Sequence, residues 1–136
     1  MSALVSGVLV GLVVGVWTYL AGASRRRMRR YWERSCTDPI WLKAFPTARS
    51  DDIRKFLLLF ANSFGFSRTL AQRFAPADRL LDIYCALYPL ENMPKDALEF
   101  DTFAKLLRST YEVDLPRIWR QDITLDVVFA QTTAAV

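Results

Sequence analysis

The first 24 residues of the chain contain no charged side chain, and six arginines follow within the next ten residues. The apolar stretch runs from Ala3 to Ala23. At about 1.5 Å per residue, a helix of this length matches the ~30 Å hydrocarbon core of a bilayer. Basic residues beside a spanning helix stay on the cytoplasmic side. The sequence therefore predicts a transmembrane anchor over residues 1–24 of a single-pass protein in a bacterial inner membrane, with the N-terminus outside and the C-terminal part in the cytoplasm.

Two other interpretations of the apolar stretch stay open at this level. A cleaved signal peptide would explain Ala21-Gly22-Ala23, which resembles a small-residue cleavage site. However, no Lys or Arg precedes the apolar stretch, and the arginines that follow it would oppose export. A core helix of a soluble protein is the third interpretation, but the stretch is longer than such a helix requires. Length and flanking charges favour the membrane anchor.

The arginines after the anchor predict contact with the membrane surface. A basic residue close to anionic lipid headgroups contributes roughly 1 kcal/mol of attraction. Residues 24–36 hold these six arginines and one glutamate and carry a net charge of +5, whereas residues 37–136 carry −1, so the rest of the chain offers no basic surface for nucleic acid. The predicted membrane-surface residues are Arg25, Arg26, Arg27, Arg29, Arg30 and Arg34. The aromatic residues predicted to form a headgroup belt beside them are Trp17, Tyr19, Tyr31 and Trp32.

Three glycines give the predicted anchor a distinct face. Gly7, Gly11 and Gly15 are four residues apart and therefore share one stripe of a helix. Small residues on a stripe allow close packing of two membrane helices. Glycine is also common in transmembrane helices without such a role. The stripe predicts a contact with a membrane protein partner or with a second copy of the chain, and the sequence does not choose between them.

The residues that usually carry enzyme chemistry are scarce. The chain has no histidine, the commonest general base and metal ligand. Its two cysteines, Cys36 and Cys85, lack metal-binding spacing and are expected to be reduced thiols in the cytoplasm. No glycine-rich phosphate loop or nucleophile elbow occurs. The sequence therefore predicts no enzyme, no catalytic or metal-binding residue, no cofactor and no small-molecule substrate.

Residues 25–50 are predicted to be a basic juxtamembrane segment and an irregular linker, followed by an all-α bundle over 51–131 and a flexible tail over 132–136. Apolar residues at helical spacing predict helices at 51–63 and 97–111, with Ser50 as N-cap and Gly65 ending the first. Shorter helical segments are expected around 70–74, 80–87, 116–120 and 124–130. The predicted architecture is a bundle of four or five short helices.

Part of this bundle resembles the acyl carrier proteins. Asp96-Ala97-Leu98-Glu99, the helix that follows, and the exit from Tyr111 to Pro116 are similar to that family's second helix and the loop after it. Ile123-Thr124-Leu125 resembles the family's entry into the last helix, and the similarity covers about residues 51–131. The resemblance implies an acyl-carrier-like helical bundle.

The departures from the family pattern change what the resemblance implies for function. Ala97 replaces the serine that bears the phosphopantetheine arm, so this position cannot bind the carrier cofactor. Glu112 stands where the family has a glycine. Carrier proteins present their second helix to partner proteins, and acidic residues around its start here could attract a basic partner. The predicted partner-binding residues are Glu91, Asp96, Glu99 and Asp101. The simpler alternative is that these charges only cap and solvate the helix.

The function predicted from these features is a non-enzymatic, membrane-anchored accessory subunit that docks its carrier-like bundle on a partner at the cytoplasmic face, within a membrane protein complex. An acyl carrier of fatty-acid or lipid metabolism is the first alternative, and it would need modification at another residue. A lipid-handling protein is the second alternative, in which aromatic residues would enclose an acyl chain rather than form an ordinary core. The aromatic residues in question are Phe56, Phe60, Phe100 and Phe103.

Overall fold

The computed structural model of the chain describes residues 2–88 and 98–134, with side chains in its first helix at 4–19, 22 and 26–32. The described part is all-α, as predicted, and its only extended pairing is one isolated β-bridge. Ala97, Glu91 and Asp96 lie outside the described residues. The elements are α1 (Ser2–Trp32), α2 (Asp38–Ala44), α3 (Ser50–Phe64), the 3-10 helix η1 (Arg68–Arg73), α4 (Leu80–Leu87), α5 (Leu98–Tyr111), α6 (Leu115–Ile118) and α7 (Leu125–Ala134).

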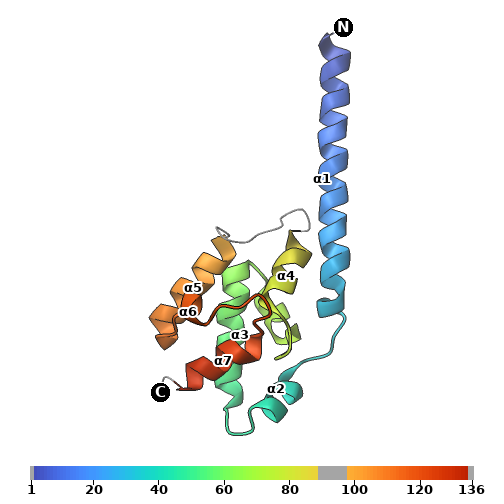
Figure 1. Cartoon of the computed structure of the whole chain (residues 1–136). Helices are drawn as coiled ribbons and strands as arrows, with labels where there is room; N and C mark the ends of the chain where they lie inside the picture. Colours follow the sequence, from blue (N-terminus) through green and yellow to red (C-terminus); the bar gives the residue numbers. More distant parts are fainter. Residues whose placement is uncertain (1, 89–97, 135–136) are drawn as a thin grey trace.

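Helix α1 is a single helix that projects from the bundle formed by the other elements (Figure 1). Large apolar side chains along its free part, between Leu4 and Tyr19, are 55–76% exposed. Among the residues that the structure describes, no helix is both long enough and apolar enough to cross a membrane.

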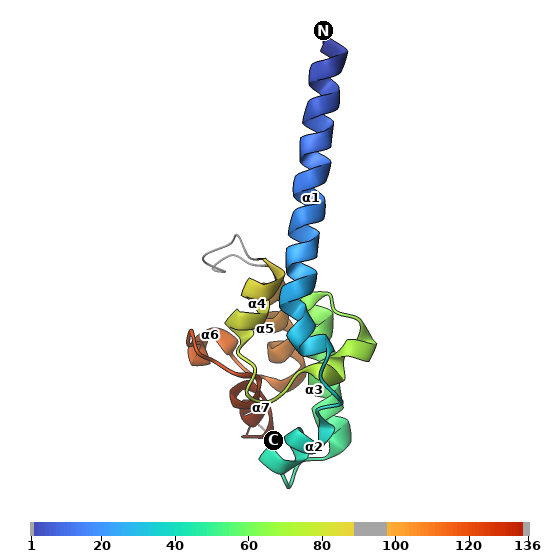
Figure 2. The same cartoon turned by 90° about the vertical axis from the view of Figure 1, so that its right-hand side faces the viewer.

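The last turns of α1 belong to the core of the bundle. Met28 and Tyr31 are buried in the hydrophobic cluster that also contains residues of α3, α4 and α7, and Trp32 packs against the same cluster. Figure 2 shows the end of α1 lying against α4. The prediction that Tyr31 and Trp32 form a headgroup belt is therefore wrong. Spaced at i, i+3 and i+4, these three apolar residues form the buried stripe of a helix whose other side carries the arginines.

The predicted linker also contains structure. Residues 38–44 form helix α2, with a proline in the first turn where its missing N–H costs nothing. Trp41 of α2 is fully buried, and its ring lies 5.6 Å from that of Phe129 in α7. Together with Met28 and Tyr31, this residue extends the core well upstream of residue 51. The division into a linker over 25–50 and a bundle from 51 is therefore wrong.

Helix α3 is close to its prediction. It begins at Ser50 itself, after Arg49 as N-cap, and Ser50 makes no side-chain cap. It ends at Gly65, which has a φ of 76° and lies in the left-handed region as predicted. The amide of Phe66 then donates to the carbonyl of Ala61 at 2.8 Å, which satisfies a carbonyl that the helix leaves free.

Aromatic rings fill the interior around α3. Phe56, Phe60 and Phe103 are fully buried. The Phe60 ring lies 5.4 Å from Phe103 in α5 and 5.1 Å from Phe74, both edge-on, an arrangement that aromatic rings favour. Phe100 packs at the border of this cluster, 5.4 Å from Phe64. In the structure these rings pack against one another as an ordinary core.

The starts of α4 and α7 are tied together. Arg79 and Thr124 form the isolated antiparallel bridge. The amide of Leu80 donates to the carbonyl of Ile123 at 3.1 Å, and the amide of Leu125 donates to the carbonyl of Asp78 at 3.0 Å. Helix α7 then continues to Ala134, four residues beyond the predicted end. Thr132 is buried, so the predicted flexible tail is wrong from 132 to 134, and residues 135–136 lie outside the described part.

Glu112 is in a conformation that glycine favours. Its φ is 58°, and it is the only non-glycine residue in the described part with a positive φ. Its amide donates to the carbonyl of Arg108 at 3.1 Å, which closes the end of α5 in the way that left-handed caps do. The resemblance to carrier proteins places a glycine at this position.

Replacing Glu112 by glycine should stabilise the protein. A side chain in the left-handed region costs roughly 1–2 kcal/mol, and part of this gain is lost because glycine is freer in the unfolded chain. We expect Glu112→Gly to raise the free energy of unfolding by about 1 kcal/mol in urea denaturation. Glu112→Ala keeps the Cβ atom and should give no such gain. Equal stability of the two variants would contradict this interpretation of the turn.

Candidate functional site: the junction of α1 with the bundle

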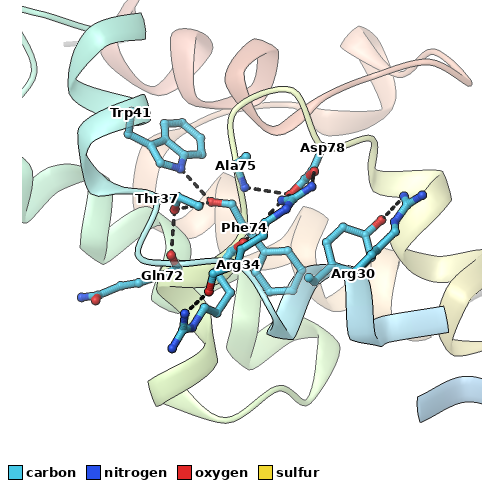
Figure 3. Close-up of polar contacts among 10 residues, drawn as sticks. Arg30, Arg34, Thr37, Trp41, Gln72, Phe74, Ala75 and Asp78 are labelled. Carbon is cyan, nitrogen blue, oxygen red and sulfur yellow. Dashed lines mark hydrogen bonds and ion pairs between the residues drawn. The ribbon is translucent and has the colours of Figure 1, made fainter. Parts of the chain in front are cut away.

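The most specific polar contacts of the described residues join the end of α1 to the loop before α4 (Figure 3). Arg34 donates from Nη1 to Oδ2 of Asp78 at 2.6 Å and from Nη2 to Oδ1 at 2.9 Å. The carboxylate of Asp78 is only 7% exposed, whereas the Arg34 side chain is 33% exposed. Oδ2 also accepts the amide of Ala75 at 2.7 Å. Bidentate pairing of this kind fixes the relative orientation of both groups.

A second set of bonds holds α2 against the segment after η1. The carbonyl of Phe74 accepts from Nε1 of Trp41 at 2.8 Å, and the carbonyl of Gln72 accepts from the amide of Thr37 at 2.9 Å. The single hydroxyl proton of Thr37 is shared between these two carbonyls, each of which lies 2.7 Å from Oγ1. Thr37 and Trp41 therefore satisfy backbone carbonyls that would otherwise be buried without partners.

Tyr31 lies at the centre of this region. Its ring is 5.6 Å from the ring of Phe74, and the guanidinium groups of Arg30 and Arg34 lie 4.7 and 5.1 Å from its centroid. Its hydroxyl accepts a hydrogen bond from Arg30. Burial raises the pKa of Tyr31, and the hydrogen bond to Asp78 raises the pKa of Arg34. The phenol therefore stays neutral and the guanidinium stays charged throughout the physiological pH range.

We call this set of contacts the junction. Its members come from both sides of the joint between α1 and the bundle, and are Tyr31, Arg34, Thr37, Trp41, Gln72, Phe74 and Asp78. The junction restrains the orientation of α1 relative to the bundle, because hydrogen bonds and buried rings fix both the end of α1 and the segment that follows it.

The predicted membrane-surface arginines fall into two groups. Arg26, Arg27 and Arg29 are exposed on α1, and Arg29 makes a long contact of 3.7 Å with Glu33. Arg30 is also exposed, but its guanidinium donates to the hydroxyl of Tyr31, whereas the half-buried Arg34 binds Asp78. The side chain of Arg25 lies outside the described part. Four of the six predicted arginines are thus exposed, and two of the six, Arg30 and Arg34, make contacts within the junction.

The glycine stripe is open in the structure. No atom lies within 4 Å of the position that a Cβ would occupy at Gly7, Gly11 or Gly15. These three positions therefore have room for another helix to approach closely.

The described acidic residues at the start of α5 are engaged within the chain. Glu99 accepts a hydrogen bond from the hydroxyl of Tyr88, and Asp101 pairs with Lys105 at 3.1 Å. The structure therefore accounts for both residues by local contacts, and their predicted role in partner binding stays a prediction. Among the described residues, no three His, Cys, Asp or Glu side chains gather in a way that would hold a metal ion.

Comparison with known proteins gives no match, since no protein-family model, characterised protein or solved structure shows significant similarity to this chain. The resemblance to acyl carrier proteins therefore stays a prediction.

Sequence reasoning missed the junction. It assigned Arg34 to the membrane surface. One signal was available, namely the spacing of Met28, Tyr31 and Trp32 among the arginines, which marks a buried helical stripe. No local signal pairs Arg34 with Asp78, because 44 residues separate them.

Proposed function

We propose that the chain is a non-enzymatic, single-pass membrane protein whose α1 anchors the helical bundle at the cytoplasmic face of a bacterial inner membrane. The observation that carries this proposal is the exposure of the apolar side chains between Leu4 and Tyr19. They include the consecutive residues 8–10 and 12–14, so they surround the helix rather than occupy one face. A helix that is apolar on all sides suits lipid better than a single protein partner.

The free energy of burying apolar side chains also favours a lipid environment for α1. Burial of one large aliphatic side chain contributes about 1.5–3 kcal/mol, while a whole domain is stable by only about 5–15 kcal/mol. If the exposed side chains of α1 faced water, the hydrophobic free energy left ungained would exceed the total stability of a small domain. In the full sequence, which includes positions of α1 whose side chains lie outside the described part, Ala3–Ala23 is free of charge and as long as a bilayer-spanning helix, and exposed arginines follow it.

Within this proposal the bundle acts as a rigidly mounted interaction module in a membrane complex. The junction supports this role because it fixes the bundle to the anchor instead of leaving it on a loose tether. The open stripe of Gly7, Gly11 and Gly15 is the proposed contact with a neighbouring membrane helix. Arg26, Arg27 and Arg29 are the proposed contacts with anionic lipid headgroups.

Cys36 allows a direct test of membrane orientation, because it is exposed just after α1. Cys85→Ser leaves Cys36 as the single thiol, and we expect this variant in the membrane fraction. A membrane-impermeant maleimide should label Cys36 in inverted vesicles, which expose the cytoplasmic face, but not in spheroplasts, which expose the outer face. The matched control carries Ser2→Cys with Cys36→Ser and should show the opposite pattern. Recovery of the protein in the soluble fraction, or labelling of Cys36 in spheroplasts, would refute the proposal.

A further inference from the structure

One end of the bundle faces the same way as the free part of α1. Helix α4 packs on α1, and its C-terminal end lies on the side from which α1 projects (Figures 1 and 2). Helix α5 starts on that side too (Figure 1). Helix α2 lies at the opposite end in both views. The bundle therefore has an α1-facing end and a distal end.

The α1-facing end carries exposed apolar surface. Leu98, the first residue of α5, is 73% exposed, and Tyr88, immediately after α4, is 38% exposed. The Tyr88 ring packs 5.0 Å from that of Tyr84, which leaves part of its surface turned outward. An aliphatic side chain beside a tyrosine is a combination typical of membrane–water interfaces, where the ring is half buried and its hydroxyl is solvated.

The orientation of this end relative to α1 is fixed. Helix α1 runs without a break to Trp32, and the junction then binds the following residues to the segment before α4. A bilayer that surrounds the free part of α1 would therefore meet the same end of the bundle in every molecule. The position of Leu98 and Tyr88 relative to that bilayer follows from the fold and not from a flexible tether.

We propose that the α1-facing end of the bundle rests on the bilayer that holds α1, with Leu98 and the ring of Tyr88 inserted into the interface between headgroups and acyl chains. This inference depends on the membrane anchoring proposed above and adds a second lipid contact to it. The α1-facing end lies beside the apolar part of α1 because α4 packs on α1, and the exposed Arg26, Arg27 and Arg29 provide attraction for anionic headgroups.

Two acidic residues lie near this contact. Asp101 is paired with Lys105, whose positive charge lowers the repulsion between Asp101 and an anionic surface. Glu99 accepts a hydrogen bond from the neutral hydroxyl of Tyr88, which does not offset the charge of its carboxylate, so attraction at this level comes from the basic residues of α1.

The test places a polarity-sensitive fluorophore at each end of the bundle. Full-length protein carrying Cys36→Ser and Cys85→Ser, with either Leu98→Cys or Ile40→Cys, is labelled with a nitrobenzoxadiazole probe and reconstituted in nanodiscs that contain anionic lipid. Ile40 is the matched control because it is an exposed apolar residue of α2 at the distal end. We expect blue-shifted, brighter emission at position 98, strongly quenched by lipids that carry a spin label near the headgroup. Position 40 should resemble the detergent-solubilised protein.

The outcomes separate this inference from the anchoring proposal. Emission typical of water at position 98, in protein that remains incorporated in nanodiscs, would overturn the inference and leave anchoring intact. Equal shifts at positions 98 and 40 would also overturn it, because the bundle would then have no preferred end. Failure of the protein to incorporate into nanodiscs would contradict the anchoring proposal itself.

Discussion

A fragment that begins at Cys36 should lose the cooperative fold that a fragment beginning at Arg26 retains. The shorter fragment lacks Met28 and Tyr31, whose side chains are buried in the core, and it lacks Arg34, the partner of Asp78. Loss of one large buried side chain costs roughly 3–5 kcal/mol, and an uncompensated buried carboxylate costs a similar amount. These losses together are comparable with the total stability of about 5–15 kcal/mol for a small domain.

Circular dichroism of both fragments checks this expectation. The fragment from Arg26 should melt in one sigmoidal transition and show a near-ultraviolet aromatic signal. The fragment from Cys36 should retain some helical signal but lose the aromatic signal and melt gradually. A sharp transition of the shorter fragment, at a temperature close to that of the longer one, would mean that the bundle is independent of α1.

Breaking the pair of Arg34 and Asp78 is the second change with a large expected effect. Removal of one partner of a buried ion pair costs roughly 3–5 kcal/mol, but Arg34 is one-third exposed and water can solvate it. We therefore expect Asp78→Ala to lower the free energy of unfolding by about 2–3 kcal/mol in urea. Arg34→Met should cost at least as much, since it leaves the buried carboxylate with only the Ala75 amide.

A double-mutant cycle makes this result specific. The variant that combines both substitutions should be less destabilised than the sum of the single variants, because the second substitution removes a charge that the first has left unpaired. Asp101→Asn is the matched control, since its partner Lys105 is an exposed i,i+4 contact, and it should cause no measurable change. Simple additivity of the two single effects would show that the pair is not an energetic unit.

The sequence was a good guide where the structural signal is local. The spacing of Ile53, Phe56, Leu57 and Phe60 marks the buried face of α3, and Gly65 marks its end, because helical periodicity and a left-handed cap are set by neighbouring residues. The end of α5 was likewise visible in the residues that follow Tyr111.

The sequence was a poor guide where one residue type serves two environments. The sequence does not distinguish an arginine that contacts lipid, as proposed for Arg26, from one that pairs with a buried carboxylate, as Arg34 does. The rings of Tyr31 and Trp32 suit an interface and a protein core equally well. Only the position of Asp78 and Phe74 in the folded chain decides between these environments, and both lie some forty residues downstream.

Thr37 and Trp41 illustrate a further limit. Their contribution is to donate to the carbonyls of Gln72 and Phe74, which are backbone groups that every residue possesses. A sequence carries no mark of which carbonyl will be buried and in need of a donor. The segment around Pro39 and Pro46 therefore reads as irregular, although α2 lies within it.

The separation between Arg34 and Asp78 also orders events during synthesis. The ribosome adds Arg34 44 residues before it adds Asp78, so α1 is complete while the partner of Arg34 does not yet exist. Translation at about 5–20 residues per second leaves an interval of seconds between the two. If α1 enters the bilayer as proposed, the bundle folds while α1 is already held in the membrane. The pairing of Asp78 with Arg34 then attaches the newly synthesised part of the bundle to this anchored helix.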